Sequence, residues 1–227
     1  MILLIPILAL AAVAQPPAAD LEESRDKQDR ASLERVAHEL AEAAGKDPKN
    51  AAAQYRLARA ESYLSEVALE LKDKDAAKDA AEAGIRAAEK AVALRPNEAE
   101  YHRMLGTLCG QVIPAHVLLA LKYGHCARAS IERAVSLDPK SAQAFVSRGV
   151  GNYYLPPAFG GGPELALRDF DKAIEMDPRS AEAYLWRGIA LRKLHRNAEA
   201  RQAIAKSLEL NPRRVWARQQ LEKTPEK

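Results

Sequence analysis

The sequence predicts an all-helical solenoid of repeated helix pairs, and three observations support this prediction. Of the 227 residues, 48% are apolar, 29% are charged and 5% are aromatic, which is typical of a folded chain with a substantial core. Alanine is abundant, and small side chains favour closely packed helices over sheets, which prefer β-branched and aromatic residues. Five amphipathic segments also end alike, with Ala or Ser five positions before a proline.

These five endings mark the ends of helices, because proline lacks an N–H group and restricts the residue before it. The prolines are Pro48, Pro96, Pro139, Pro178 and Pro212, so successive intervals are 48, 43, 39 and 34 residues. The last interval equals the period of the tetratricopeptide repeat (TPR).

Residues 181–212 resemble the TPR family closely. The family pattern combines an aromatic residue, Leu-Gly, further bulky and small residues, and a final proline. The matching residues are Tyr184, Gly188, Leu191, Ala200, Ile204, Ser207 and Pro212, whereas Arg187 stands where Leu is usual. Two earlier units match similarly around Gly149 and Gly106, and the first matches more weakly. We expect Gly188 and Gly149 to be structural, at places where paired helices cross.

The resemblance implies a right-handed solenoid of about four antiparallel helix pairs within residues 48–212, at about 51–96, 99–139, 142–178 and 181–212. A single helix over 21–47 is expected before it, and a capping helix and tail over 213–227 after it. The additional length of the early units must lie between paired helices. We expect longer helices around Leu71 and Asp75, a kink or restart at Pro114, and a glycine-rich loop before Pro163.

The N-terminal segment predicts export. Residues 1–14 carry no charged side chain and end in Ala12-Val13-Ala14, the small-x-small form of a signal-peptidase site. We therefore expect a signal peptide at 1–14, a linker at 15–20, and a periplasmic or secreted mature protein. A membrane span needs about 20 apolar residues, whereas the uncharged N-terminal segment has only the fourteen residues 1–14. We therefore expect no membrane span in the mature chain.

The same sequence favours protein binding over catalysis. The net charge of +3 is too small to indicate a nucleic acid or an anionic membrane as partner. No catalytic triad or nucleotide-binding fingerprint is recognised in the sequence, so we expect no enzyme activity and no cofactor. The preferred interpretation is a scaffold that binds a peptide or helix of another protein. The alternative is an envelope transport accessory for a small ligand or solute-binding protein, with a pocket closed by residues 111–125 and 156–163.

The TPR resemblance implies a binding groove along the concave face, lined by the first helix of each unit. Tyr55, Arg59 and Tyr63 are spaced four apart, so they share one helical stripe. Another interpretation places some of the tyrosines in the core between units. The candidate groove residues are Tyr55, Arg59, Tyr63, Arg103, Thr107, Val150, Tyr153, Tyr154, Leu185, Ile189 and Arg192.

Two cysteines and nearby histidines form the other notable group. Cys109 lies late in one helix and Cys126 early in the next, so antiparallel pairing allows a disulfide if the Cα atoms lie within about 7 Å; otherwise both are small buried residues. Among the histidines, His102 and His116 lie seven residues from Cys109, which separates them by about 10 Å along a helix. We therefore expect no metal site.

Overall fold

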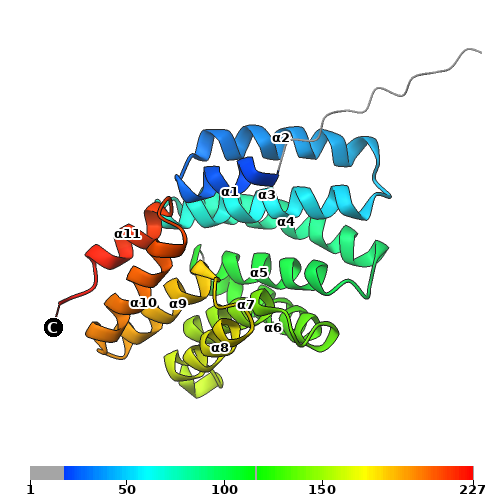
Figure 1. The fold of residues 1–227 in the computed structure, drawn as a ribbon. Coiled ribbons are helices and arrows are strands. Elements are labelled where there is room, and N and C mark those ends of the chain that lie inside the picture. Colours follow the sequence, from blue (N-terminus) through cyan, green and yellow to red (C-terminus); the bar gives the residue numbers. More distant parts are fainter. Residues whose placement is uncertain (1–17, 116, 227) are drawn as a thin grey trace, which may run out of the picture.

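The computed structural model describes residues 18–115 and 117–226, and this part of the chain is all-helical (Figure 1). It contains eleven α-helices, two short 3-10 helices and no strand, which confirms the predicted fold class. The expected signal peptide at 1–14, and residues 15–17 of the expected linker, lie outside the described residues. Residues 18–20 begin the first helix.

Four consecutive helix pairs form the body of the fold. Their bounds are α3 (Ala51–Glu70) with α4 (Lys74–Leu94), α5 (Ala99–Ala115) with α6 (Ala120–Leu137), α7 (Ala142–Tyr154) with α8 (Pro163–Met176), and α9 (Ala181–Lys193) with α10 (Asn197–Leu210). The second helix of each pair ends two residues before its proline. Short 3-10 helices, Val117–Leu119 and Pro157–Phe159, lie within the two insertions.

Side-chain caps start several of these helices. Asn50, Asp73, Ser141 and Ser180 each accept a hydrogen bond from the backbone N–H three residues later, at 3.1–3.4 Å. Each such cap contributes about 0.5–2 kcal/mol. Asn50, Ser141 and Ser180 follow Pro48, Pro139 and Pro178 by two residues, so at these three places the residues after the proline start the next helix.

Glycines let paired helices cross closely, as expected. A Cβ atom on Gly149 would lie 2.5 Å from the ring of Phe170, and one on Gly188 would lie 2.9 Å from the carbonyl oxygen of Ala200. Gly106 occupies the same place in the unit before, with similarly little space. These distances are shorter than real Cβ contacts, so the packing role predicted for Gly149 and Gly188 is confirmed.

The N-terminal region differs from the single helix expected over 21–47. It forms two helices, α1 (Ala18–Asp26) and α2 (Arg30–Lys46). Gln28 has a positive φ of 56°, and the side chain of Asp29 accepts a hydrogen bond from the backbone N–H of Ser32, which starts α2. The chain therefore reverses at 27–29, and α1 packs against both α2 and α3 (Figure 1).

The first helices of the pairs form the inner wall of the array. Contacts run from α3 to α5, from α5 to α7 and from α7 to α9. A final helix, α11 (Val215–Glu222), packs on α10 at the C-terminal end. The array curves so far that the α10–α11 turn reaches the N-terminal helices: Asn211 donates a hydrogen bond of 2.7 Å to Asp26 of α1. Figure 1 shows the two ends side by side.

Candidate partner-binding groove

The eleven candidate groove residues lie on α3, α5, α7 and α9, the helices of the inner wall. The structure does not bring them into one continuous open surface. Some are covered by α1, some are bonded to one another across the wall, some are open, and some are covered by α11.

Helix α1 covers the stripe of α3, which we define as Arg59, Tyr63, Glu66 and Glu70. Arg59 forms an ion pair with Glu22 of α1. The guanidinium of Arg25, also on α1, lies 5.0 Å from the ring centroid of Tyr63, a distance at which a cation is attracted to the ring. The chain itself therefore occupies the part of the groove predicted around Arg59 and Tyr63.

A polar ladder joins α3, α5 and α7 across the inner wall. Tyr55 donates a hydrogen bond of 2.7 Å to Glu100. Arg103 donates two to Glu100, at 2.5 and 2.6 Å, and one of 3.2 Å to Ser147. Thr107 also contacts Ser147 at 3.2 Å.

The ladder is charge-balanced and holds the wall together. Burial alone would raise the pKa of Glu100, but the hydrogen bonds and charge of Arg103 hold that pKa below its usual value. Burial and the neighbouring Glu100 carboxylate raise the pKa of the Tyr55 phenol. Tyr55 also stacks on Tyr101, with ring centroids 5.0 Å apart. Tyr55 and Arg103 therefore position helices, whatever else they contact.

The open region is an aromatic patch, formed by Tyr153, Tyr154, Trp186 and Trp216. Neighbouring ring centroids lie between 5.1 and 6.1 Å apart, as favoured aromatic pairs do. The ammonium of Lys193 lies 4.3 Å from the ring centroid of Tyr153. Tyr154 is 52% exposed. Tyr154 and Lys193 are therefore exposed to solvent, whereas Tyr153, Trp186 and Trp216 are partly buried against the neighbouring core.

Sequence reasoning missed the two tryptophans of this patch. Trp186 occupies a place that the TPR groove pattern does not use, and Trp216 lies on the capping helix. One signal was available, because these are both tryptophans of the chain and tryptophan often anchors interfaces.

The last three candidates lie beneath the C-terminal helix rather than in an open groove. Leu185 and Ile189 are buried in a cluster with Ala217 of α11. Arg192 donates hydrogen bonds to the backbone and side chain of Gln220. These residues face α11 because this helix packs onto the end of the array, in the place that the first helix of a further repeat would take. Val150 is partly buried against the core formed by α8, α9 and α10.

A buried charge cluster lies where the two ends of the array meet, and sequence reasoning did not identify it. Arg214, in the α10–α11 turn, is 1% exposed. It donates hydrogen bonds of 2.5 Å to Glu66 and to Glu70 of α3, and one of 3.1 Å to Glu182 of α9. Burial raises the pKa of Glu66 to about 7, against the opposing effect of Arg214.

The cysteines are bonded, with Sγ atoms 2.01 Å and Cα atoms 6.0 Å apart, and join α5 to α6. Among the described residues, no group of three or more His, Cys, Asp or Glu side chains is placed to hold a metal ion. In the same part of the chain, no helix combines the length and hydropathy that crossing a membrane requires.

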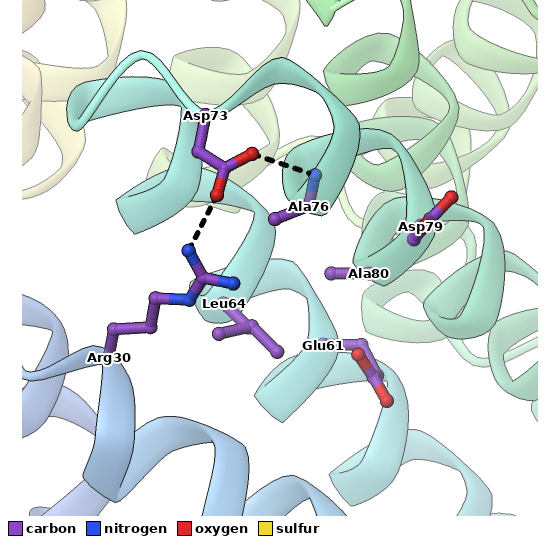
Figure 2. Close-up of a pocket in the computed structure, with 7 residues that line it drawn as sticks. All are labelled: Arg30, Glu61, Leu64, Asp73, Ala76, Asp79 and Ala80. Atoms are coloured by element: carbon purple, nitrogen blue, oxygen red, sulfur yellow. Dashed lines mark hydrogen bonds and ion pairs between the residues drawn. The ribbon is translucent and has the colours of Figure 1, made fainter.

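Two pockets in the described part of the chain are considered for a small ligand. The first, about 470 Å³, lies among α2, α3 and α4 (Figure 2). In it Arg30 donates a hydrogen bond of 2.7 Å to Asp73, and burial raises the pKa of Glu61 to about 7. The second, about 310 Å³, lies between α1 and the α10–α11 turn. Neither pocket is lined by residues of the insertions, 111–125 and 156–163.

Comparison with protein families gives two matches. Residues 18–155 match the family described as regulator of microtubule dynamics protein 1-3, and residues 159–214 match a tetratricopeptide repeat family. The first match begins at the first residue of α1 and ends just after α7. No curated protein is similar enough to count as a match.

Among solved structures, one has the same fold and others are similar at lower TM-scores. TTC0263, a thermophilic TPR protein from Thermus thermophilus, is 16% identical, covering 88% of this chain and 97% of its own, with a TM-score of 0.61. YrrB, a TPR protein with an unusual peptide-binding site, is 20% identical, covering 92% and 93%, with a TM-score of 0.42. MamA from Desulfovibrio magneticus RS-1 is 19% identical, covering 89% and 99%, with a TM-score of 0.45. The first similarity establishes the TPR fold.

Proposed function

This chain belongs to the regulator of microtubule dynamics protein 1-3 family, and we propose that it is a non-catalytic scaffold that holds a peptide or helix of another protein on its inner wall. TPR proteins generally serve as protein-binding scaffolds. Microtubule regulation is the property for which the family is named, whereas the proposal for this chain concerns the binding step.

The observation that carries the proposal is the aromatic patch. Tyr and Trp are the residues that most often supply the binding energy of protein interfaces, and here four of them meet on α7, α9 and α11. Tyr154 is half-exposed, and Lys193 adds a cation at the same place. A partner with an apolar side chain next to a carboxylate would contact both. Binding of this kind needs no covalent step.

The alternative, an envelope transport accessory for a small ligand, has less support. It requires a pocket closed by the insertions, and both described pockets are lined by other segments. The aromatic patch lies on the surface of the wall, so it suits a protein side chain better than an enclosed metabolite.

A photo-crosslinking amino acid at position 154 in the full-length chain tests the scaffold proposal. The captured protein is identified, purified and titrated against the wild type, Tyr154→Ala and Phe159→Ala. Phe159 is the matched control, because it is 71% exposed but lies in the insertion loop. We expect Tyr154→Ala to weaken binding at least about tenfold, as at an interface anchor, and Phe159→Ala to leave it unchanged. Equal affinities for all three would refute the proposed site.

We also propose that the protein is exported and begins at Gln15. The support is the uncharged N-terminal segment ending in Ala12-Val13-Ala14, together with the Cys109–Cys126 bond, since disulfides persist in oxidising compartments. N-terminal sequencing of the fractionated protein tests this. Detection of Met1 in the major species would count against it.

A further inference from the structure

Helix α1 lies where a TPR protein would hold the helix of a partner. Glu22 pairs with Arg59, Arg25 lies over the Tyr63 ring and 3.5 Å from Glu182, and Leu21 is buried with the core of α2 and α3. The contacts of α1 therefore cover Arg59 and Tyr63 of the α3 stripe, while Glu66 and Glu70 are bonded to Arg214. The match to the family begins at the first residue of this helix.

The contacts that hold α1 are mainly polar. In its sequence, AADLEESRD, Leu21 is the one apolar side chain larger than alanine. Ion pairs and hydrogen bonds supply most of the other contacts, including Asn211 with Asp26 and Arg213 with Glu23 at 3.3 Å. The carboxylates of Glu22 and Glu23 are exposed, whereas Asp26 is buried. Attraction between exposed charges falls with rising salt, and apolar burial is the larger stabilising factor in most protein contacts.

We propose that α1 is a replaceable occupant of the groove, and that the α3 stripe binds a partner helix of the same chemistry. This inference rests on the proposed scaffold function and identifies the partner class. The partner helix carries a leucine, an acidic residue directly after it, and an arginine three residues after the acid, as Leu21, Glu22 and Arg25 do. α1 must leave before that helix can bind.

The geometry explains each part of this pattern. The acidic residue forms an ion pair with Arg59. The Nε atom of Arg59 in turn donates a hydrogen bond of 3.4 Å to the hydroxyl of Tyr63, which holds it on the wall. The leucine enters the apolar cluster between α2 and α3. The arginine covers the Tyr63 ring and reaches the carboxylate of Glu182. One broad helical face can present all three side chains, because the arginine is a neighbour of the leucine four positions before it and of the acidic residue three positions before it.

The hinge between α1 and α2 permits the exchange. It comprises residues 27–29, and its positive φ lies at Gln28, a residue that is not glycine. Gln28 is held by hydrogen bonds to Glu70 at 2.8 Å and to Gln219. Helix α2 has its own cap at Asp29 and its own buried face, so α1 can leave without unfolding α2.

The test uses the full chain and a fluorescent synthetic peptide with the sequence of residues 18–28. Substitutions Leu21→Asp and Glu22→Ala, made together, release α1 in one variant, and the neutral residue at position 22 cannot pair with either charge at position 59. We expect this release variant to bind the peptide at least about tenfold more tightly than the wild type, whose groove is filled. Hydrogen exchange at residues 18–28 reports the release directly, and circular dichroism confirms that the remaining helices are retained.

A charge exchange provides the matched control. Adding Arg59→Glu to the release variant should abolish binding of the original peptide and create binding of a peptide with Glu22→Arg. A released α1 without peptide binding, equal hydrogen exchange in variant and wild type, or no effect of Arg59→Glu would each overturn the inference. Failure of the scaffold function would look different. In that case no partner whose binding depends on Tyr154 would be found, but the release variant would still bind the peptide.

Discussion

Replacing Arg214 by Met should strongly destabilise the closed array. The guanidinium is 1% exposed and is bonded to Glu66, Glu70 and Glu182. Removing one partner of a buried ion pair costs about 3–5 kcal/mol, because the remaining charge is left uncompensated. Since about 1 kcal/mol lowers Tm by about 2–4 °C in a chain of this size, we expect a decrease of about 10 °C.

Arg213 provides the neighbouring control for this experiment. Its side chain is 66% exposed and pairs with Glu23 at 3.3 Å. Exposed pairs contribute about 0–1 kcal/mol, so Arg213→Ala should change Tm by no more than a few degrees. Thermal unfolding followed by circular dichroism measures both variants. Equal decreases for Arg213→Ala and Arg214→Met would refute the assignment of Arg214 as the centre of the closure.

The pH dependence of the Arg214→Met variant gives a second check. The pKa of Glu66 is already raised by burial in the wild type, and losing Arg214 removes the main opposing charge. A carboxyl group whose pKa is higher in the folded state stabilises the fold at low pH and loses that contribution as pH rises through the folded pKa. The loss of stability of the variant relative to the wild type should therefore be larger at pH 8 than at pH 5. A larger deficit at pH 5 would contradict this reasoning.

Three further predictions concern stability and are measured by thermal unfolding. Glu61 lines the first pocket (Figure 2), and burial raises its pKa to about 7. Glu61→Gln should therefore raise Tm at pH 8 and have a smaller effect at pH 5; the reverse order would contradict the assignment. Gly188→Leu should cost about 1–3 kcal/mol by overpacking, whereas Gly151→Leu, where a Cβ meets open space, should be tolerated. Reducing the bond between Cys109 and Cys126, which are separated by 17 residues, should cost about 3 kcal/mol; an unchanged Tm would argue against a stabilising bond.

Local sequence signals predicted the helix pairs because they act within a few residues. Each proline stops its helix through its own backbone, and each capping Asn or Ser starts the next through a bond three residues away. Gly149 and Gly188 were predictable for a related reason, since a repeat places the same crossing at the same position. The all-α fold followed from these signals.

The groove was less predictable because its shape depends on residues far apart in sequence. Arg214 and Glu70 are 144 positions apart, and no periodicity indicates that the array curves enough to join them. The break at Gln28 also lacks the usual signals of glycine or proline, so residues 21–47 read as one helix. Once that break forms, α1 turns back and covers Arg59 and Tyr63, which the repeat pattern alone assigns to open surface.

The two helices that cover the groove differ in how they are held, and this difference determines which part of the wall a partner can reach. Helix α11 covers Leu185 and Ile189 with apolar side chains in a shared core. Removing α11 would expose that core to water, at a free-energy cost of about 25 cal/mol per Å² of apolar surface. Helix α1 covers Arg59 and Tyr63 mainly with charged groups, which water can solvate when the helix leaves. Exchange is therefore expected at the α1 end, while the aromatic patch beside α11 stays in place.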